Sequence, residues 1–207
     1  MKNKYEDLIK QTFEFPQPGF DVVDNELNFN GIPLMDIIRQ YGTPLKISYL
    51  PKISEQIQRA KIMFNVGMAK ADYKGKYVYC YCTKSSQFSF VLEEVLKNET
   101  HIETSSAYDM PIIKELHAKG LLPKDKFIIC NGYKRPMYQE FIVELIQDGF
   151  ENLIPILDSK REINYYKEHL KTKTKIGIRI ASEEEPSFEF YSSRLGIRYK
   201  DILQFYK

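Results

Sequence analysis

The apolar residues of this 207-residue chain recur in short runs at a spacing of about 25 residues. The runs begin near Tyr77, Ile102, Phe127, Leu153 and Ile176. Each run is about five to eight residues long and lacks strict alternation, which is the pattern of strands covered on both faces. We therefore expect five buried strands in the second part of the chain.

Amphipathic segments fill the intervals between these runs, at residues 88–96, 110–118, 137–146 and 162–170. Gly120 and Gly149 lie where the second and third segments should end as helices. Five strand–helix units in series predict an α/β fold with a parallel sheet covered by helices. The periodicity does not decide between two arrangements of this sheet. One is an open doubly wound sheet, and the other is a partial (β/α)8 barrel that needs three more strands after Lys207.

The first 50 residues have a different pattern. They predict a helix at residues 4–13, a hairpin of strands 20–24 and 27–29, and a helix that Pro33 opens and Gly42 closes. A strand at residues 45–50 and a longer helix from residue 51 to about 71 should follow. The chain thus divides into an N-terminal segment, residues 1–50, and a barrel domain, residues 51–207.

Charge and hydropathy argue against several classes of partner. The chain has 30 Lys and Arg residues against 28 Asp and Glu residues, a net charge of +2 without a basic block, so we expect no nucleic-acid binding. No run of about 18 apolar residues occurs, so we expect no membrane span. Three cysteines and an N-terminus without an apolar stretch favour a cytoplasmic location.

Polar side chains follow every predicted strand, at the edge where parallel sheets bind their ligands. They include Lys84, Glu103, Ser106, Asn131, Asp158 and Arg179. Lys84 is the most informative, because a lysine between an apolar run and small residues should be partly desolvated, which favours its neutral amine. A neutral amine can condense with an aldehyde cofactor such as pyridoxal phosphate. The alternative is a surface lysine without a chemical role.

The residues around Lys84 resemble a known motif. Tyr81-Cys82-Thr83-Lys84 is similar to the Tyr-x-x-Lys cofactor-lysine motif of the fold-type-III pyridoxal-phosphate decarboxylases, alanine-racemase-like barrels that act on ornithine, arginine and diaminopimelate. Further segments match this family in its own order, at residues 41–45, 103–110, 131–134, 157–162, 178–180 and 193–196. The Asn-Gly-Tyr-Lys at 131–134 is similar to that of biosynthetic arginine decarboxylases. The similarity covers residues 41–199.

This resemblance implies that Lys84 is the catalytic lysine and holds pyridoxal phosphate. It also implies that Glu103 orients this lysine and that Asn131 belongs to the cofactor-binding residues. Arg179 should support charge beneath the cofactor, although a salt bridge with Glu103 or Asp158 is equally consistent with its position.

Two roles are consistent with the position of Ser106. It stands among the expected cofactor-binding residues, but with Asp109 it should also begin the helix after the second strand, as the cap of that helix. The cysteines lack further ligands at metal-binding spacing, so no metal site is expected.

The implied reaction is the decarboxylation of a basic amino acid. Arginine, converted to agmatine for polyamine synthesis, is the favoured small-molecule substrate because of residues 131–134 and of Ser193-Arg194. Ornithine and diaminopimelate are alternatives. A homodimer or a larger homo-oligomer is expected. A second interpretation is a non-catalytic protein, either a carrier of pyridoxal phosphate or a regulator of a decarboxylase. A third is an open nucleotide-binding sheet, which the lack of a Gly-rich loop after the first strand disfavours.

The sequence also departs from the family. Ser86 stands where the family has an asparagine, and Glu103 where it has an aspartate. Nothing after Lys207 corresponds to the family's ring-stacking histidine, its Gly-rich phosphate loops, the glutamate that pairs with the pyridine nitrogen, or its C-terminal β domain. We therefore expect a truncated N-terminal part that is inactive alone, with residues 1–50 suited to pack on the missing β domain. An exposed strand edge should promote association.

Overall fold

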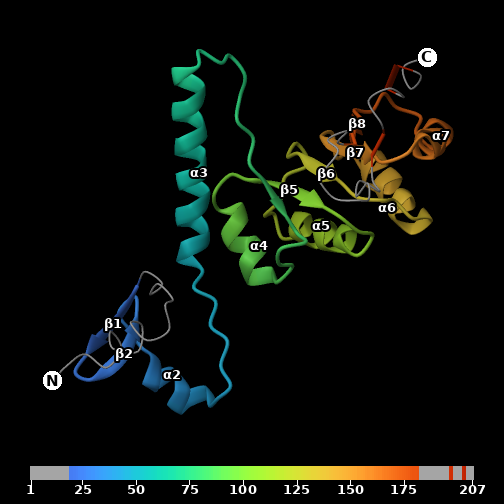
Figure 1. Ribbon diagram of the computed structural model, residues 1–207. Coiled ribbons are helices and arrows are strands. Elements are labelled where there is room, and N and C mark those ends of the chain that lie inside the picture. The colour runs from blue at the N-terminus through green and yellow to red at the C-terminus, as the bar shows by residue number, and fades with distance from the viewer. Residues whose placement is uncertain (1–18, 182–195, 198–201, 204–207) are drawn as a thin grey trace, which may run out of the picture. The chain divides into compact units, whose positions relative to one another are not determined.

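The structure is a computed structural model that describes residues 19–181, 196–197 and 202–203 (Figure 1). The predicted helix at 4–13 and the Ser193-Arg194 motif lie outside these residues. The chain divides into two compact units, residues 1–48 and residues 49–207.

A small antiparallel sheet and one helix form the described part of the first unit. Strands β1 (Phe20–Val23) and β2 (Glu26–Phe29) pair as a hairpin, and β3 (Ile32–Pro33) extends it. The hairpin turn has positive φ angles of 49° and 70° at its two residues, Asp24 and Asn25, as a two-residue turn of the hairpin kind requires. Helix α2 (Leu34–Tyr41) follows and ends at Gly42. The predicted hairpin and helix are confirmed.

The predicted strand at residues 45–50 is wrong. These residues adopt no strand structure, and residues 45–48 are exposed. An apolar run becomes a strand only when a neighbouring strand accepts and donates its backbone hydrogen bonds. None of the described strands pairs with this run. The helix after it is confirmed as α3 (Pro51–Lys70), with proline at its first position.

The second unit contains a parallel sheet of five strands. The strands are β4 (Cys80–Cys82), β5 (His101–Thr104), β6 (Ile128–Cys130), β7 (Leu153–Leu157) and β8 (Gly177–Ile178). The helices between them are α4 (Ser89–Leu96), α5 (Asp109–Ala118), α6 (Pro136–Gln147) and α7 (Lys160–His169). Each element lies within a few residues of its predicted position, so the five strand–helix units are confirmed.

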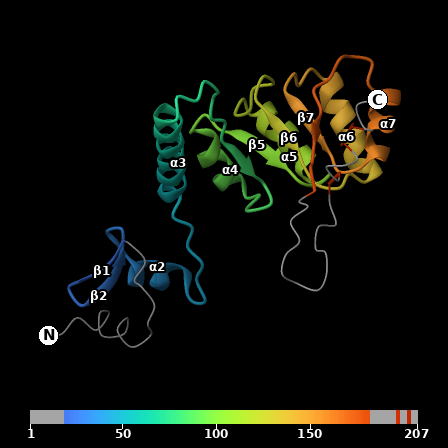
Figure 2. The same ribbon diagram turned by 45° about the horizontal axis from the view of Figure 1, so that its top comes forward.

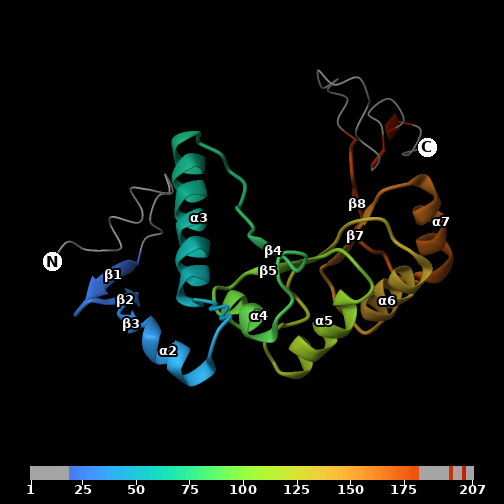
Figure 3. The same cartoon turned by 60° about the horizontal axis from the view of Figure 1, so that its bottom comes forward.

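The strand order identifies the architecture. The strands lie side by side in sequence order, β4-β5-β6-β7-β8, and all adjacent pairs are parallel (Figure 2). Helices α4 to α7 lie in a row along one side of the strands (Figure 3). A doubly wound sheet would reverse its order at a switch point and carry helices on both faces. The sheet is therefore an arc of a barrel, and an open doubly wound sheet is excluded.

The hydrophobic core lies between this arc and its helices. Strand residues that point toward the helices are fully buried, such as Ile102 on β5, Ile128 on β6 and Leu157 on β7. They pack against Met110 of α5 and Tyr138 of α6, among others. None of the described helices is long and apolar enough to cross a membrane.

The first half of α3 is fastened to α4. Its Ile57 is buried against Val91 and Val95. Asn98, just after α4, is 8% exposed, and its side-chain amide donates to Ser54 Oγ at 2.7 Å and to the Glu94 carbonyl at 2.9 Å. These contacts hold the helix before β4 against the helix after it.

Candidate active site

The sheet has one face that α4 to α7 do not cover, which we call the open face. The pairing of Cys80 with His101, of Cys82 with Glu103 and of Glu103 with Ile129 places these five residues on it. All five are partly buried, unlike the buried residues that alternate with them along β5 and β6. At the carboxyl edge of the open face, polar side chains from neighbouring strands approach one another.

Lys84 lies in the turn directly after β4, at this carboxyl edge. Its side chain is exposed, so the expected partial desolvation is wrong for the described structure. The physical reason is its place in the sheet, because β4 is the first strand of the arc and has a described neighbour, β5, on one side alone. Lys84 is therefore an accessible amine beside the open face.

Glu103 and Asn131, which belong to neighbouring strand–helix units, form a hydrogen bond at this edge. Asn131 follows β6 and donates its side-chain amide to Glu103 Oε1 at 3.1 Å. The side-chain oxygen of Asn131, Oδ1, accepts the Gly132 N–H at 2.8 Å. Gly132 has a φ of +80°, and a Cβ there would lie 3.2 Å from the Ser105 carbonyl oxygen, so glycine suits this close approach. The result is a carboxylate held in a defined orientation on the open face.

Ser106 is tied to Asp109. The carboxylate of Asp109 accepts the backbone N–H of Ser105 at 2.8 Å and that of Ser106 at 3.0 Å, and the Ser106 hydroxyl donates to it at 3.3 Å. Asp109 begins α5, as expected. Ser106 is not the cap of this helix, because α5 follows Tyr108 without a side-chain cap and the serine donates its hydrogen bonds to the aspartate instead.

From the sequence, Arg179 has two possible partners, Glu103 and Asp158. In the structure it pairs with Asp158. Its guanidinium lies 3.8 Å from Asp158 Oδ1, which is an ion pair longer than a hydrogen bond. The Arg179 side chain is 38% exposed, whereas that of Asp158 is 2% exposed. The Arg179 side chain is thus partly accessible at the carboxyl edge.

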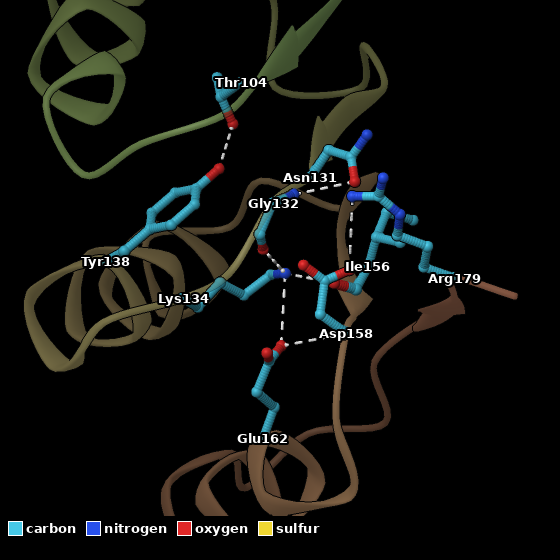
Figure 4. Close-up of polar contacts among 9 residues, drawn as sticks. All are labelled: Thr104, Asn131, Gly132, Lys134, Tyr138, Ile156, Asp158, Glu162 and Arg179. Atoms are coloured by element: carbon cyan, nitrogen blue, oxygen red, sulfur yellow. Dashed lines mark hydrogen bonds and ion pairs between the residues drawn. The ribbon is translucent and has the colours of Figure 1, made fainter. Parts of the chain in front are cut away.

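A buried ion pair lies next to this contact, as Figure 4 shows. Lys134 Nζ is 3.3 Å from Glu162 Oε2, and the two side chains are 0% and 3% exposed. Lys134 also donates to the carbonyl oxygens of Gly132, at 2.7 Å, and of Ile156. Burial raises the pKa of the Glu162 carboxyl, and the neighbouring ammonium of Lys134 opposes this rise. The ion pair joins the loop after β6 to the start of α7.

In the sequence, Lys134 and Glu162 fall in two segments that match the family, 131–134 and 157–162, but the sequence does not pair them with each other. Glu162 follows Asp158 by four residues at the start of a helix, which is the available signal that both carboxylates lie at one site.

The cysteines of the open face have no described metal partners. Among the residues that the structure describes, no group of three or more His, Cys, Asp and Glu side chains could hold a metal ion. Burial raises the pKa of the Cys80 thiol, and the Glu103 charge adds to this effect. Cys130, on the helix side of β6, is fully buried.

The arc of strands with its outer helices is part of a (β/α)8 barrel, and the solved structures similar to it include several amino-acid decarboxylases. Among solved structures, the diaminopimelate decarboxylase of M. jannaschii in complex with L-lysine matches 91% of this chain, with a TM-score of 0.75 and 17% identity. The biosynthetic arginine decarboxylase of Campylobacter jejuni matches 100% of the chain, with a TM-score of 0.69 and 18% identity. The arginine decarboxylase of Paramecium bursaria Chlorella virus matches 83%, with a TM-score of 0.59 and 12% identity.

The chain spans less than half the length of each of these enzymes: 44%, 34% and 42%, respectively. No protein-family model matches the sequence, and no curated protein matches it. At identities of 12 to 18%, the likeness shows the fold alone. An incomplete (β/α)8 barrel is therefore established.

The residues at the carboxyl edge fit part of pyridoxal phosphate. An exposed amine, Lys84, could meet its aldehyde, and the partly exposed guanidinium of Arg179 suits an anionic group. The loop at Ser105 and Ser106 does not suit the phosphate, because Asp109 already accepts both backbone N–H groups. The chain thus offers an anchor and a cation, but no phosphate cradle within this loop.

Proposed function

We propose that this chain carries the cofactor-anchoring part of a pyridoxal-phosphate-dependent decarboxylase that acts on a basic amino acid, with Lys84 as the anchoring lysine. The observation that carries the proposal is the position of Lys84. It stands immediately after the first strand of the barrel arc, at the edge where ligands of such barrels bind. The Tyr-x-x-Lys pattern that ends at Lys84 supports the same assignment.

Pyridoxal phosphate supplies an electron sink for the bond that breaks when an amino acid loses CO2. The residues of this chain would prepare that step. Lys84 would bind the aldehyde, and its amine is accessible for this purpose. Glu103, oriented by the Asn131 amide, would direct its charge toward the same edge. Arg179 would bind a carboxylate or phosphate oxygen with the donors that Asp158 does not occupy.

Arginine is the proposed substrate. The Asn-Gly-Tyr-Lys at 131–134 and Ser193-Arg194 favour it, and one arginine decarboxylase of the same fold was solved with agmatine bound. Ornithine and diaminopimelate differ from arginine in the group at the far end of the side chain. Release of CO2 from each of these amino acids, measured separately, distinguishes the three substrates.

The first test is reductive trapping of pyridoxal phosphate at limiting cofactor, read by intact mass and peptide mapping. We expect one adduct per chain, at Lys84. The Lys84→Arg variant should lose this adduct while keeping its fold by circular dichroism. The matched control is Lys70→Arg, which changes an exposed lysine in the last turn of α3 and should leave the adduct in place.

Free pyridoxal phosphate reacts with any exposed amine, so the distribution of the label decides the result. If Lys84 takes no more label than Lys70, the anchoring role is refuted. If Lys84 is labelled selectively but no basic amino acid releases CO2, the cofactor site stands and the chain by itself is a carrier of pyridoxal phosphate.

A further inference from the structure

A single side-chain hydrogen bond joins the loop after β4 to the start of α5. Gln87 Nε2 donates to Asp109 Oδ1 at 2.6 Å. Gln87 lies three residues after Lys84, just before α4 begins at Ser89. Asp109 is the first residue of α5 and is fully buried. The bond therefore connects the segment that carries Lys84 to a fixed point in the core.

Asp109 uses both carboxylate oxygens. Oδ2 accepts the N–H groups of Ser105 and Ser106, so it is held by the loop after β5. Oδ1 accepts Gln87 from the loop after β4. Hydrogen bonds to an ionised acceptor are shorter and stronger than neutral ones, and 2.6 Å is short for a bond from nitrogen. One buried charge thus organises two neighbouring loops at the carboxyl edge.

The other restraints on the Lys84 segment lie closer to β4. The backbone and hydroxyl of Thr83 donate to the Glu103 carbonyl at 2.9 and 3.2 Å. Ser85 N donates to the Cys82 carbonyl at 3.0 Å, and the Tyr81 hydroxyl donates to the Ser86 carbonyl at 3.2 Å. All of these anchor the segment to β4 and β5. Among the described side-chain hydrogen bonds of residues 83–87, only the Gln87 bond reaches the helix layer.

We propose that Gln87 and Asp109 are positioning residues, which fix the turn at residues 83–88 and thereby aim the exposed Lys84 amine at the open face. The inference rests on the proposed role of Lys84 as the cofactor anchor. An exposed lysine side chain is free to sample many rotamers, so the direction of its backbone determines where the amine is concentrated. A displacement of about 1 Å in a reacting group can lower a rate by about 100-fold.

The decisive variant is Gln87→Glu. It places a second carboxylate against Asp109 Oδ1, where the two like charges repel and the donated hydrogen is lost. Gln87 is exposed, so this change leaves the core intact. The double variant Gln87→Glu with Asp109→Asn restores the bond with its donor and acceptor exchanged. In it, the introduced asparagine amide would donate to the introduced glutamate, while the asparagine oxygen still accepts the Ser105 and Ser106 N–H groups.

Two readouts separate the positioning role from the cofactor role. Hydrogen exchange of the amides at residues 83–88 needs no cofactor, and we expect it to accelerate about tenfold in Gln87→Glu. The rate of reductive trapping at Lys84, divided by that at Lys70, should fall by about tenfold or more. The double variant should return both values to within about twofold of the wild type. Gln56→Glu, the same change at an exposed site on α3, is the matched control and should alter neither.

Three outcomes would overturn the positioning role, and a fourth would refute the proposed function. Unchanged exchange in Gln87→Glu overturns the positioning role whatever the cofactor does. Faster exchange with an unchanged trapping ratio also overturns it, because the turn then moves without consequence for Lys84. Failure of the double variant to rescue shows that the substitution acted by some route other than this bond, which overturns it as well. If the wild-type Lys84 takes no selective label, the proposed function fails, while the exchange data still test the restraint on the turn.

Discussion

Removal of the buried Lys134 ammonium should strongly destabilise the second unit. At 3.3 Å and an effective dielectric constant of about 20, the attraction between Lys134 and Glu162 amounts to about 5 kcal/mol. The Lys134→Met variant loses this attraction and also leaves the Gly132 and Ile156 carbonyls without their donor. Part of the loss is recovered because an ammonium no longer has to be desolvated. The net expectation is about 3–5 kcal/mol, which is typical for a buried pair that loses one partner.

The assay is urea unfolding followed by circular dichroism, with Lys114→Met as the matched control. Lys114 pairs with Glu144 at 2.5 Å, but these side chains are 37% and 49% exposed. Solvent screens such a pair, so the same substitution there should cost about 0–1 kcal/mol. The double variant Lys134→Met with Glu162→Leu removes both charges and should recover most of the lost stability, to within about 1–2 kcal/mol.

The pH dependence gives a second check. Burial raises the pKa of Glu162 above its ordinary value of 4.5, so the folded state binds a proton more readily than the unfolded state. This carboxylate therefore costs stability above its folded pKa, and the cost is relieved as the pH falls toward the ordinary value. Without Lys134 the pKa should rise further, so the deficit of Lys134→Met should shrink on acidification. A deficit below about 1 kcal/mol at neutral pH, or one that grows on acidification, would refute the reasoning.

Three further predictions concern the same unit. His101 Nδ1 accepts the Phe127 N–H at 2.9 Å, and burial lowers the His101 pKa. The stability that neutral His101 contributes should therefore be lost as the pH falls from 6.5 through the folded pKa. Urea unfolding at several pH values should show this loss in the wild type and not in His101→Phe. Gly132→Ala should lower the melting temperature, at a cost of about 1–2 kcal/mol for its φ of +80°, whereas Gly67→Ala inside α3, where no atom obstructs a Cβ, should raise it. Ellman's reagent should modify Cys80 and Cys82 in the folded protein but spare Cys130, whose burial raises its pKa to about 11; rapid reaction at Cys130 would contradict the packing of β6.

The sequence periodicity predicted most of the strands and helices, because each strand of this architecture is buried by the helices next to it in the sequence. Each strand of the arc lies between a helix layer and the open face, so each leaves an apolar run of its own, and β5 to β8 begin within one residue of the expected positions. The run at 45–50 shows the limit of this reasoning. It resembles the other runs, but strand formation depends on a partner that periodicity does not reveal.

The site was predictable in its location and less so in its contacts. The polar residues after each strand could be placed at one edge because parallel strands all end there. The partner of each residue depends on distances across loops. Sequence spacing alone did not indicate that Asn131 would bind Glu103, or that Asp109 would accept Gln87 from another loop. The exposure of Lys84 likewise follows from the place of β4 at the end of the arc, which is a tertiary property.

The fastening of α3 to α4 has a consequence for covalent modification. Asn98-Glu99-Thr100 has the Asn-x-Thr pattern at which oligosaccharides are attached to the asparagine side-chain nitrogen. In the folded chain that nitrogen is committed to Ser54 and to the Glu94 carbonyl. A transferase would have to separate the two helices to reach it, and an attached sugar would keep them apart. The folded protein is therefore a poor glycan acceptor at this position, because the packing of α3 against α4 shields the Asn98 amide nitrogen.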